Sequence, residues 1–74
     1  MSNEIHPAVL STLAWFDCDH LPAHLREIVA PFRELAHGMA GQLEGAELTY
    51  GLRELLAAKD CMVRARVAME RKGE

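Results

Sequence analysis

The chain has few aromatic residues and few cysteines, and each shortage excludes a class of protein. Only four of its 74 residues are aromatic, whereas half belong to the hydrophobic types, chiefly leucine, alanine, valine and methionine. This apolar content suits helix packing better than sheet packing and excludes a disordered tail. Two cysteines cannot form a disulfide framework, so we expect Cys18 and Cys61 to be reduced thiols, with a single disulfide as the alternative.

The chain also lacks a large excess of charge of either sign. Its net charge is −3, and acidic and basic residues are interspersed along the sequence. Non-specific binding of DNA or RNA polymers needs a basic surface, so we expect neither as a partner. A small phosphate ligand is compatible with this charge, since a few arginines in one pocket suffice. The longest stretch without Asp, Glu, Lys or Arg, residues 5–16, is too short to span a bilayer. We therefore expect a cytoplasmic protein without a signal peptide or a membrane contact.

The first part of the chain, residues 1–20, predicts a short N-terminal helical segment and a connector. Pro7 can open a helix, since its missing N–H costs nothing in a first turn. The connector leads into a long helix. Asp19 or His20 is expected to cap that helix, with Pro22 in its first turn.

Apolar periodicity predicts an all-α fold, with residues 1–74 forming one helical-hairpin domain. Apolar residues recur at steps of four and three over 21–43 and again over 47–70, which indicates two long amphipathic helices. Glycines near the junction place a turn between them, so the helices should pack antiparallel. Pro31 falls inside the first helix and should kink it or divide it into two.

The second long helix carries two adjacent apolar stripes, more than one antiparallel partner can cover. The first stripe is Leu48, Leu52, Leu55, Met62 and Met69, and the second is Leu56, Val63 and Val67. We expect another copy of the chain to cover the excess, because closed homo-oligomers are the common solution. The alternative is that the N-terminal segment, with Trp15 and Phe16, covers it.

Two basic residues, Lys59 and Arg66, fall where the first stripe of that helix continues. A charge at such a position is costly unless it is paired or presented to a ligand. In one interpretation the stems lie along the apolar surface and the charged groups pair with Glu70 or a neighbouring chain. In the other, they line an anion pocket at an oligomer interface. From the residues alone we prefer the pairing.

Catalytic and metal-binding signatures are weak. Cys18, His20 and His24 could hold zinc, but their spacing matches no structural zinc module. Cys18 and His20 could also act as nucleophile and base, but a chain this short leaves little room for a substrate cleft and an oxyanion hole. There is no Gly-rich phosphate loop, no GxSxG and no HExxH. We expect no enzyme activity, no cofactor and no metal.

Anion binding is the most plausible of the chemistries that remain. Arg26, Arg33 and His37 lie on one side of the first long helix by their spacing. The connector 16–22 should pack near the start of that helix, where it could offer an aromatic platform for a base beside an arginine for a phosphate. The alternative, which we prefer from the residues alone, is that both arginines pair with nearby glutamates as solvated charges.

Three segments resemble a family of bacteriophage anti-defence proteins. They are residues 15–22 (WFDCDHLP), 31–36 (PFRELA) and 51–60 (GLRELLAAKD). These segments are similar to the opening motif and the two helices of the helical-hairpin sponges that block CBASS and Thoeris immunity, and the resemblance covers residues 15–68.

The resemblance implies a viral immune-evasion protein that acts in the host bacterial cytoplasm. Such sponges are homo-oligomers, often hexamers. They bind a cyclic oligonucleotide or a cyclic ADP-ribose-type messenger and sequester it without cleaving it, so the host effector is never activated. The alternative from the residues is a helical protein–protein interaction adaptor without a nucleotide ligand.

The resemblance also implies a ligand site. In the family a basic residue of the first helix, here Arg33, meets a phosphate, and the aromatic residue of the opening motif stacks on a base. Cys18 stands where the motif has tyrosine, so Phe16, Trp15 or His20 would take over the stacking. The expected ligand-binding residues are Phe16, Cys18, His20, Pro22, Arg26, Arg33, Arg53 and Lys59.

Overall fold

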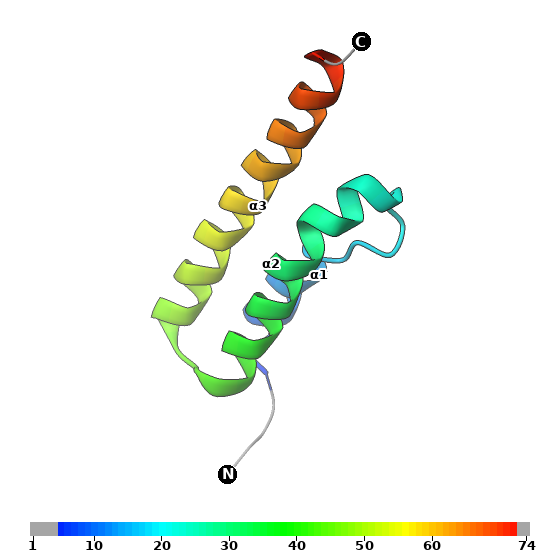
Figure 1. Cartoon of the computed structure of the whole chain (residues 1–74). Coiled ribbons are helices and arrows are strands. Elements are labelled where there is room, and N and C mark those ends of the chain that lie inside the picture. Colours follow the sequence, from blue (N-terminus) through cyan, green and yellow to red (C-terminus); the bar gives the residue numbers. More distant parts are fainter. Residues whose placement is uncertain (1–4, 73–74) are drawn as a thin grey trace.

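The computed structural model describes residues 5–72, and its regular elements in this range are all α-helices. The helices are α1 (Pro7–Ala14), α2 (Ala23–Gln42) and α3 (Ala46–Lys72) (Figure 1). The predicted all-α class is therefore confirmed. Within residues 5–72, no helix has both the length and the apolar character needed to cross a membrane.

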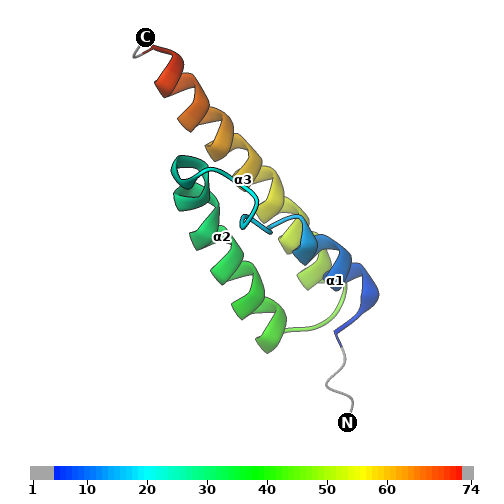
Figure 2. The ribbon, with the colours of Figure 1, turned by 90° about the vertical axis from the view of Figure 1, so that its right-hand side faces the viewer.

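The two long helices, α2 and α3, lie side by side and run in opposite directions, joined by residues 43–45 (Figures 1 and 2). Gly45 has a φ of 104°, a left-handed conformation that glycine adopts without a Cβ clash, so the chain can turn there into α3. The short helix α1 contacts both long helices. The C-terminal part of α3 extends beyond the start of α2 (Figure 1).

The start of each of the first two helices follows from a proline. Pro7 is the first residue of α1, and the side chain of His6 accepts a hydrogen bond from the Ala8 N–H at 3.0 Å. Pro22 is the N-cap of α2, and no side chain of residues 5–72 caps this helix. The expected capping by Asp19 or His20 is therefore wrong, because the Asp19 carboxylate accepts from an arginine of α2 instead.

Pro31 does not divide the first long helix, because α2 continues from Ala23 to Gln42 with this proline inside it. Proline leaves the carbonyl four residues earlier, that of Glu27, without its helical N–H partner. Both residues are exposed, so water can replace the missing donor. Such a position tolerates a proline that a buried helix face would not.

The core forms where the three helices meet. Its buried members are Val9, Leu13, Phe16, Ala36, Ala40, Leu48 and Leu52. Phe16 is the largest fully buried side chain, with 0% exposed. Burying one phenylalanine contributes about 1.5–3 kcal/mol, so this residue fastens the N-terminal segment onto the long helices.

The N-terminal segment covers only the first half of α3. The core ends at Leu52, with Leu55 and Leu56 packed at its edge. Further along, Met62 and Met69 are 50% and 67% exposed. The alternative in which the N-terminal segment covers the excess apolar surface therefore holds for the first half of α3 and fails for the second.

Candidate functional site

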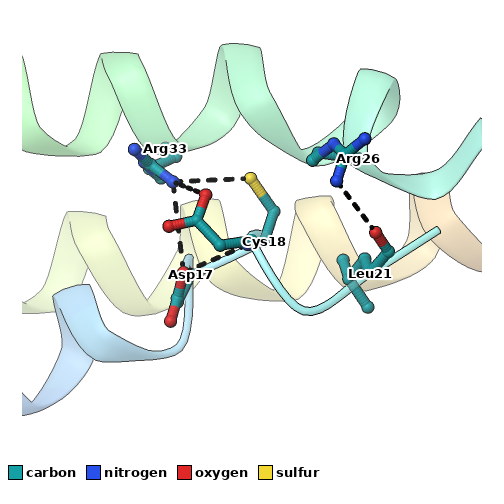
Figure 3. A network of polar contacts seen from close by, with 6 residues as sticks. Asp17, Cys18, Leu21, Arg26 and Arg33 are labelled. Atoms are coloured by element: carbon teal, nitrogen blue, oxygen red, sulfur yellow. Dashed lines mark hydrogen bonds and ion pairs between the residues drawn. The ribbon is translucent and has the colours of Figure 1, made fainter. Parts of the chain in front are cut away.

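Arg33 fastens the connector onto α2 (Figure 3). Its Nη1 donates a hydrogen bond to Asp19 Oδ1 at 3.1 Å and lies 4.0 Å from Asp17 Oδ1. The same nitrogen lies 3.6 Å from the sulfur of Cys18. The Asp19 carboxylate, through this hydrogen bond and its charge, raises the pKa of the Arg33 guanidinium, and Cys18 adds to the effect. Arg33 is therefore a permanently charged group.

The connector has a local structure that presents these acceptors. Asp17 Oδ1 accepts from the Asp19 N–H at 3.2 Å, which is the aspartate turn that this residue type favours. The side chain between them, Cys18, points inward and is 2% exposed. At the far end, Arg26 donates to the Leu21 carbonyl at 3.3 Å (Figure 3). Two arginines of α2 therefore hold the connector at both ends.

A surface groove of about 630 Å³ lies between α1 and α2 beside Arg33. Its lining residues are Leu10, Leu13, Ala14, Asp17, Asp19, Arg33, Glu34 and His37. The α1 side is apolar, whereas the connector and α2 supply ionisable groups. The volume falls within the range of about 300–1,000 Å³ that is typical of small-molecule sites.

Carboxylates outnumber basic groups in this groove. Asp17, Asp19 and Glu34 lie beside a single arginine, Arg33, and a histidine, His37. An anion would have to share the guanidinium with two carboxylates of the connector. In the described part of the chain, however, every contact of Arg33 uses Nη1. Arginine has five N–H donors, so Nη2 and Nε can still donate to a phosphate oxygen.

Two expected ligand contacts are wrong, because the structure buries both side chains. Phe16 is 0% exposed and belongs to the core, so its ring offers no face for stacking on a base. Cys18 is 2% exposed and likewise has no surface for a ligand. The neighbouring Trp15 is 70% exposed and is the aromatic residue of this segment that a ligand can reach.

The structure brings Arg33 and His37 together in the groove and leaves the other expected residues elsewhere. His20 and Pro22 are exposed on the connector, and Arg26 is engaged with a backbone carbonyl. Arg53 is exposed on α3 and does not line the groove.

The two basic residues of α3 that fall where its first apolar stripe continues are paired within the chain. This pairing is the interpretation that we prefer from the sequence. Lys59 Nζ forms a salt bridge with Asp60 Oδ1 at 2.8 Å, and the Lys59 side chain is 12% exposed. Arg66 lies 3.5 Å from a Glu27 carboxylate oxygen and donates to the His24 carbonyl at 3.3 Å. The expected partner Glu70 is wrong, because it pairs with the His24 ring at 3.3 Å.

The cysteines and histidines do not form a metal site. Cys18 and Cys61 are free thiols, as expected, and Cys61 is exposed. Among residues 5–72, no group of three or more His, Cys, Asp and Glu side chains could hold a metal ion. The zinc alternative built on Cys18, His20 and His24 therefore has no support.

Asp17 and Asp19 are the site residues that sequence reasoning missed. Their signal is two carboxylates that flank a cysteine in a short connector; the sequence predicts a capping role for Asp19 and none for Asp17. No protein-family profile, no curated protein and no solved structure matches the chain.

Proposed function

We propose that this chain is a phage anti-defence sponge, which binds a cyclic oligonucleotide immune messenger in the host bacterial cytoplasm and sequesters it uncleaved. The observation that carries the proposal is the placement of Arg33. Asp19 holds its guanidinium at 3.1 Å, beside a groove of ligand size, with two of its nitrogens available to a phosphate. The resemblance of residues 15–22 to the sponge motif supports the same assignment.

Because carboxylates outnumber basic groups in this groove, the binding of an anion there requires more than one copy of the chain. A lone copy offers one shared guanidinium against three carboxylates. A second copy that brings its exposed arginines Arg26 and Arg53 to this groove would offset the excess of carboxylates. The proposal therefore includes a homo-oligomer, with the hexamer of the sponges as the expected assembly and messenger sites between copies.

Trp15 takes the stacking role in this proposal. Its indole is 70% exposed, and it lies on the segment that Arg33 fastens through Asp17 and Asp19. Stacking of a base on an aromatic ring contributes about 1–3 kcal/mol and tolerates any base. Trp15 does not line the groove, so in this proposal its indole stacks on a base that projects from a phosphate held by Arg33, and such a site would accept cyclic di- and trinucleotides or a cyclic ADP-ribose-type messenger.

The test is a titration of the oligomer with these messengers, by native mass spectrometry and calorimetry. We expect Arg33→Ala to weaken binding by more than tenfold without changing the native mass. Arg64→Ala is the control, since this arginine contacts the Cys61 thiol on α3 and does not line the groove. The ligand should return with its mass unchanged on denaturation. Unaltered affinity in Arg33→Ala would refute the role of this arginine, and an oligomer that takes up none of the messengers would refute the sponge.

A helical protein–protein interaction adaptor is the second candidate, favoured by a separate observation. A groove of about 500 Å³ between α2 and α3 is lined mainly by apolar side chains: Leu35, Met39, Leu43, Glu44, Glu47, Leu48, Gly51, Leu52 and Leu55. Amphipathic helices bind in grooves of this kind. The adaptor predicts no nucleotide uptake and a protein partner that is recovered by pull-down and displaced by Leu43→Glu.

A further inference from the structure

One flank of α3 carries small and large apolar residues in alternation, at steps of four and three. We call this flank the α3 seam; its members are Gly51, Leu55, Ala58, Met62, Ala65 and Met69. At 3.6 residues per turn it is centred roughly 80° around the helix from the buried residues Leu48 and Leu52. Met62 and Met69 are 50% and 67% exposed, so much of the seam is uncovered within the described chain.

The seam is self-complementary when a second α3 is laid against it in the opposite direction. With the twofold axis at position 60, Gly51 faces the partner's Met69, and Leu55 faces the partner's Ala65. Ala58 then faces the partner's Met62. Every large side chain meets a small one, which lets two helices approach closely and interdigitate. A parallel pair would instead place methionine against methionine and glycine against glycine.

We propose that two copies of this chain pair through the α3 seam, antiparallel about a twofold axis at position 60. Met69 of each copy then enters the α2–α3 groove of the other. The inference rests on the self-association in the proposed function and identifies one of the surfaces that produces it. A twofold contact of this kind is isologous, so both copies use the same residues.

The α2–α3 groove is shaped to receive that methionine. Gly51 and Leu55 belong both to the seam and to the groove lining. On the opposite wall, Leu35 and Leu43 are 47% and 55% exposed. An unbranched methionine side chain adapts to an irregular apolar gap better than a branched one. The partner's Met69, lying over Gly51, would cover apolar surface that the single chain leaves exposed.

The charges at the two ends of the seam favour the antiparallel direction. Glu44 and Glu47 line the outer end of the groove, whereas α3 ends in Arg71 and Lys72. Antiparallel pairing brings the partner's basic end to the acidic end of the groove, and the symmetry repeats this contact. Asp60 lies on the opposite side of α3 from the seam by helical spacing and is bonded to Lys59, so the axis brings no like charges together.

Gly51→Leu tests the pairing directly. A Cβ at Gly51 would meet nothing within 4 Å, so a leucine has room in the single chain and is the better helix former. In the pair it would collide with the partner's Met69. We expect the native mass to fall to half of the wild-type value or less, with unchanged helix content by circular dichroism. Gly41→Leu is the matched control on α2, where a Cβ also meets nothing within 4 Å.

A swap tests whether Ala58 faces the partner's Met62. Ala58→Met should weaken association because two methionines then face each other, and Met62→Ala should weaken it by leaving a gap. The double variant restores one large and one small residue at each contact, so it should recover the wild-type native mass. A double variant weaker than both single variants would overturn the antiparallel register.

Cross-linking provides an independent readout. Cys61 is exposed and lies one residue from the axis, whereas Cys18 is buried. A short bis-maleimide should therefore join two copies through Cys61, and Gly51→Leu should abolish the product. A Gly51→Leu protein with wild-type native mass and cross-linking overturns the seam. Messenger uptake is measured separately, so an oligomer that binds messenger but ignores Gly51→Leu would overturn the seam and leave the sponge intact.

Discussion

Phe16 and Trp15 are neighbours in the sequence with opposite surroundings, and we predict that they have separable roles. Phe16 is 0% exposed in the core, and Trp15 is 70% exposed beside it. We expect Phe16→Ala to lower the free energy of unfolding by about 3–5 kcal/mol, since it removes a buried ring and leaves a cavity. We expect Trp15→Ala to change it by about 0.5 kcal/mol or less, as is usual for an exposed side chain.

These magnitudes are large against the stability available to the chain. At about 0.05–0.15 kcal/mol per residue, 74 residues give a free energy of unfolding of about 4–11 kcal/mol. Phe16→Ala therefore removes about a quarter or more of the total, and the variant should melt at a much lower temperature. Phe16→Leu is the conservative control, because it retains an apolar side chain and most of the volume.

The assay is urea unfolding followed by circular dichroism, with all variants at the same protein concentration because association contributes to stability. A messenger titration of the folded variants supplies the second measurement, in which Trp15→Ala should weaken binding by about 1–3 kcal/mol. A loss below about 1 kcal/mol for Phe16→Ala would refute the packing argument. Equal binding by Trp15→Ala and wild type would refute the stacking role.

Two further predictions concern the ends of the long helices. Arg66→Met removes the bonds to Glu27 and the His24 carbonyl, and we expect a loss of about 0.5 kcal/mol with faster amide exchange over residues 62–72. Arg64→Met, which removes a hydrogen bond to the nearby Cys61 thiol, is the control, and equal exchange in both variants would contradict the pairing. Gly45→Ala should cost about 1–2 kcal/mol in thermal unfolding, because φ is 104° there. Gly41→Ala, inside α2, should gain up to about 1 kcal/mol, and a gain at both glycines would contradict the turn geometry.

The helices were predictable because their signal repeats. Apolar steps of four and three over 21–43 and 47–70 place the two long helices close to the observed Ala23–Gln42 and Ala46–Lys72. The second runs further than expected because Arg71 and Lys72 complement the helix dipole in its last turn. The residue at which each helix begins or ends depends on one local contact, which the apolar periodicity does not show.

The site was less predictable, because its geometry depends on contacts between distant residues. Asp19 was interpreted as a cap since capping is local, but its carboxylate accepts from Arg33, which lies in the middle of α2. That bond orients the connector, so Phe16 and Cys18 point inward and Trp15 outward. Nothing in the spacing of residues 15–22 shows which aromatic side chain the connector turns toward the core.

The two proposed surfaces lie on different flanks of α2 and cannot be covered by one contact. Arg33 and His37 line the α1–α2 groove, whereas Leu35 and Met39 line the groove that receives the partner's Met69. A seam pair therefore leaves the messenger groove open, and its acidic balance still calls for basic residues from another copy. Each copy then needs at least two different contacts, which a closed ring of three seam pairs provides. In such a hexamer Gly51→Leu should yield trimers that keep the Arg33 contact, whereas a chain that associates only through the seam should yield monomers.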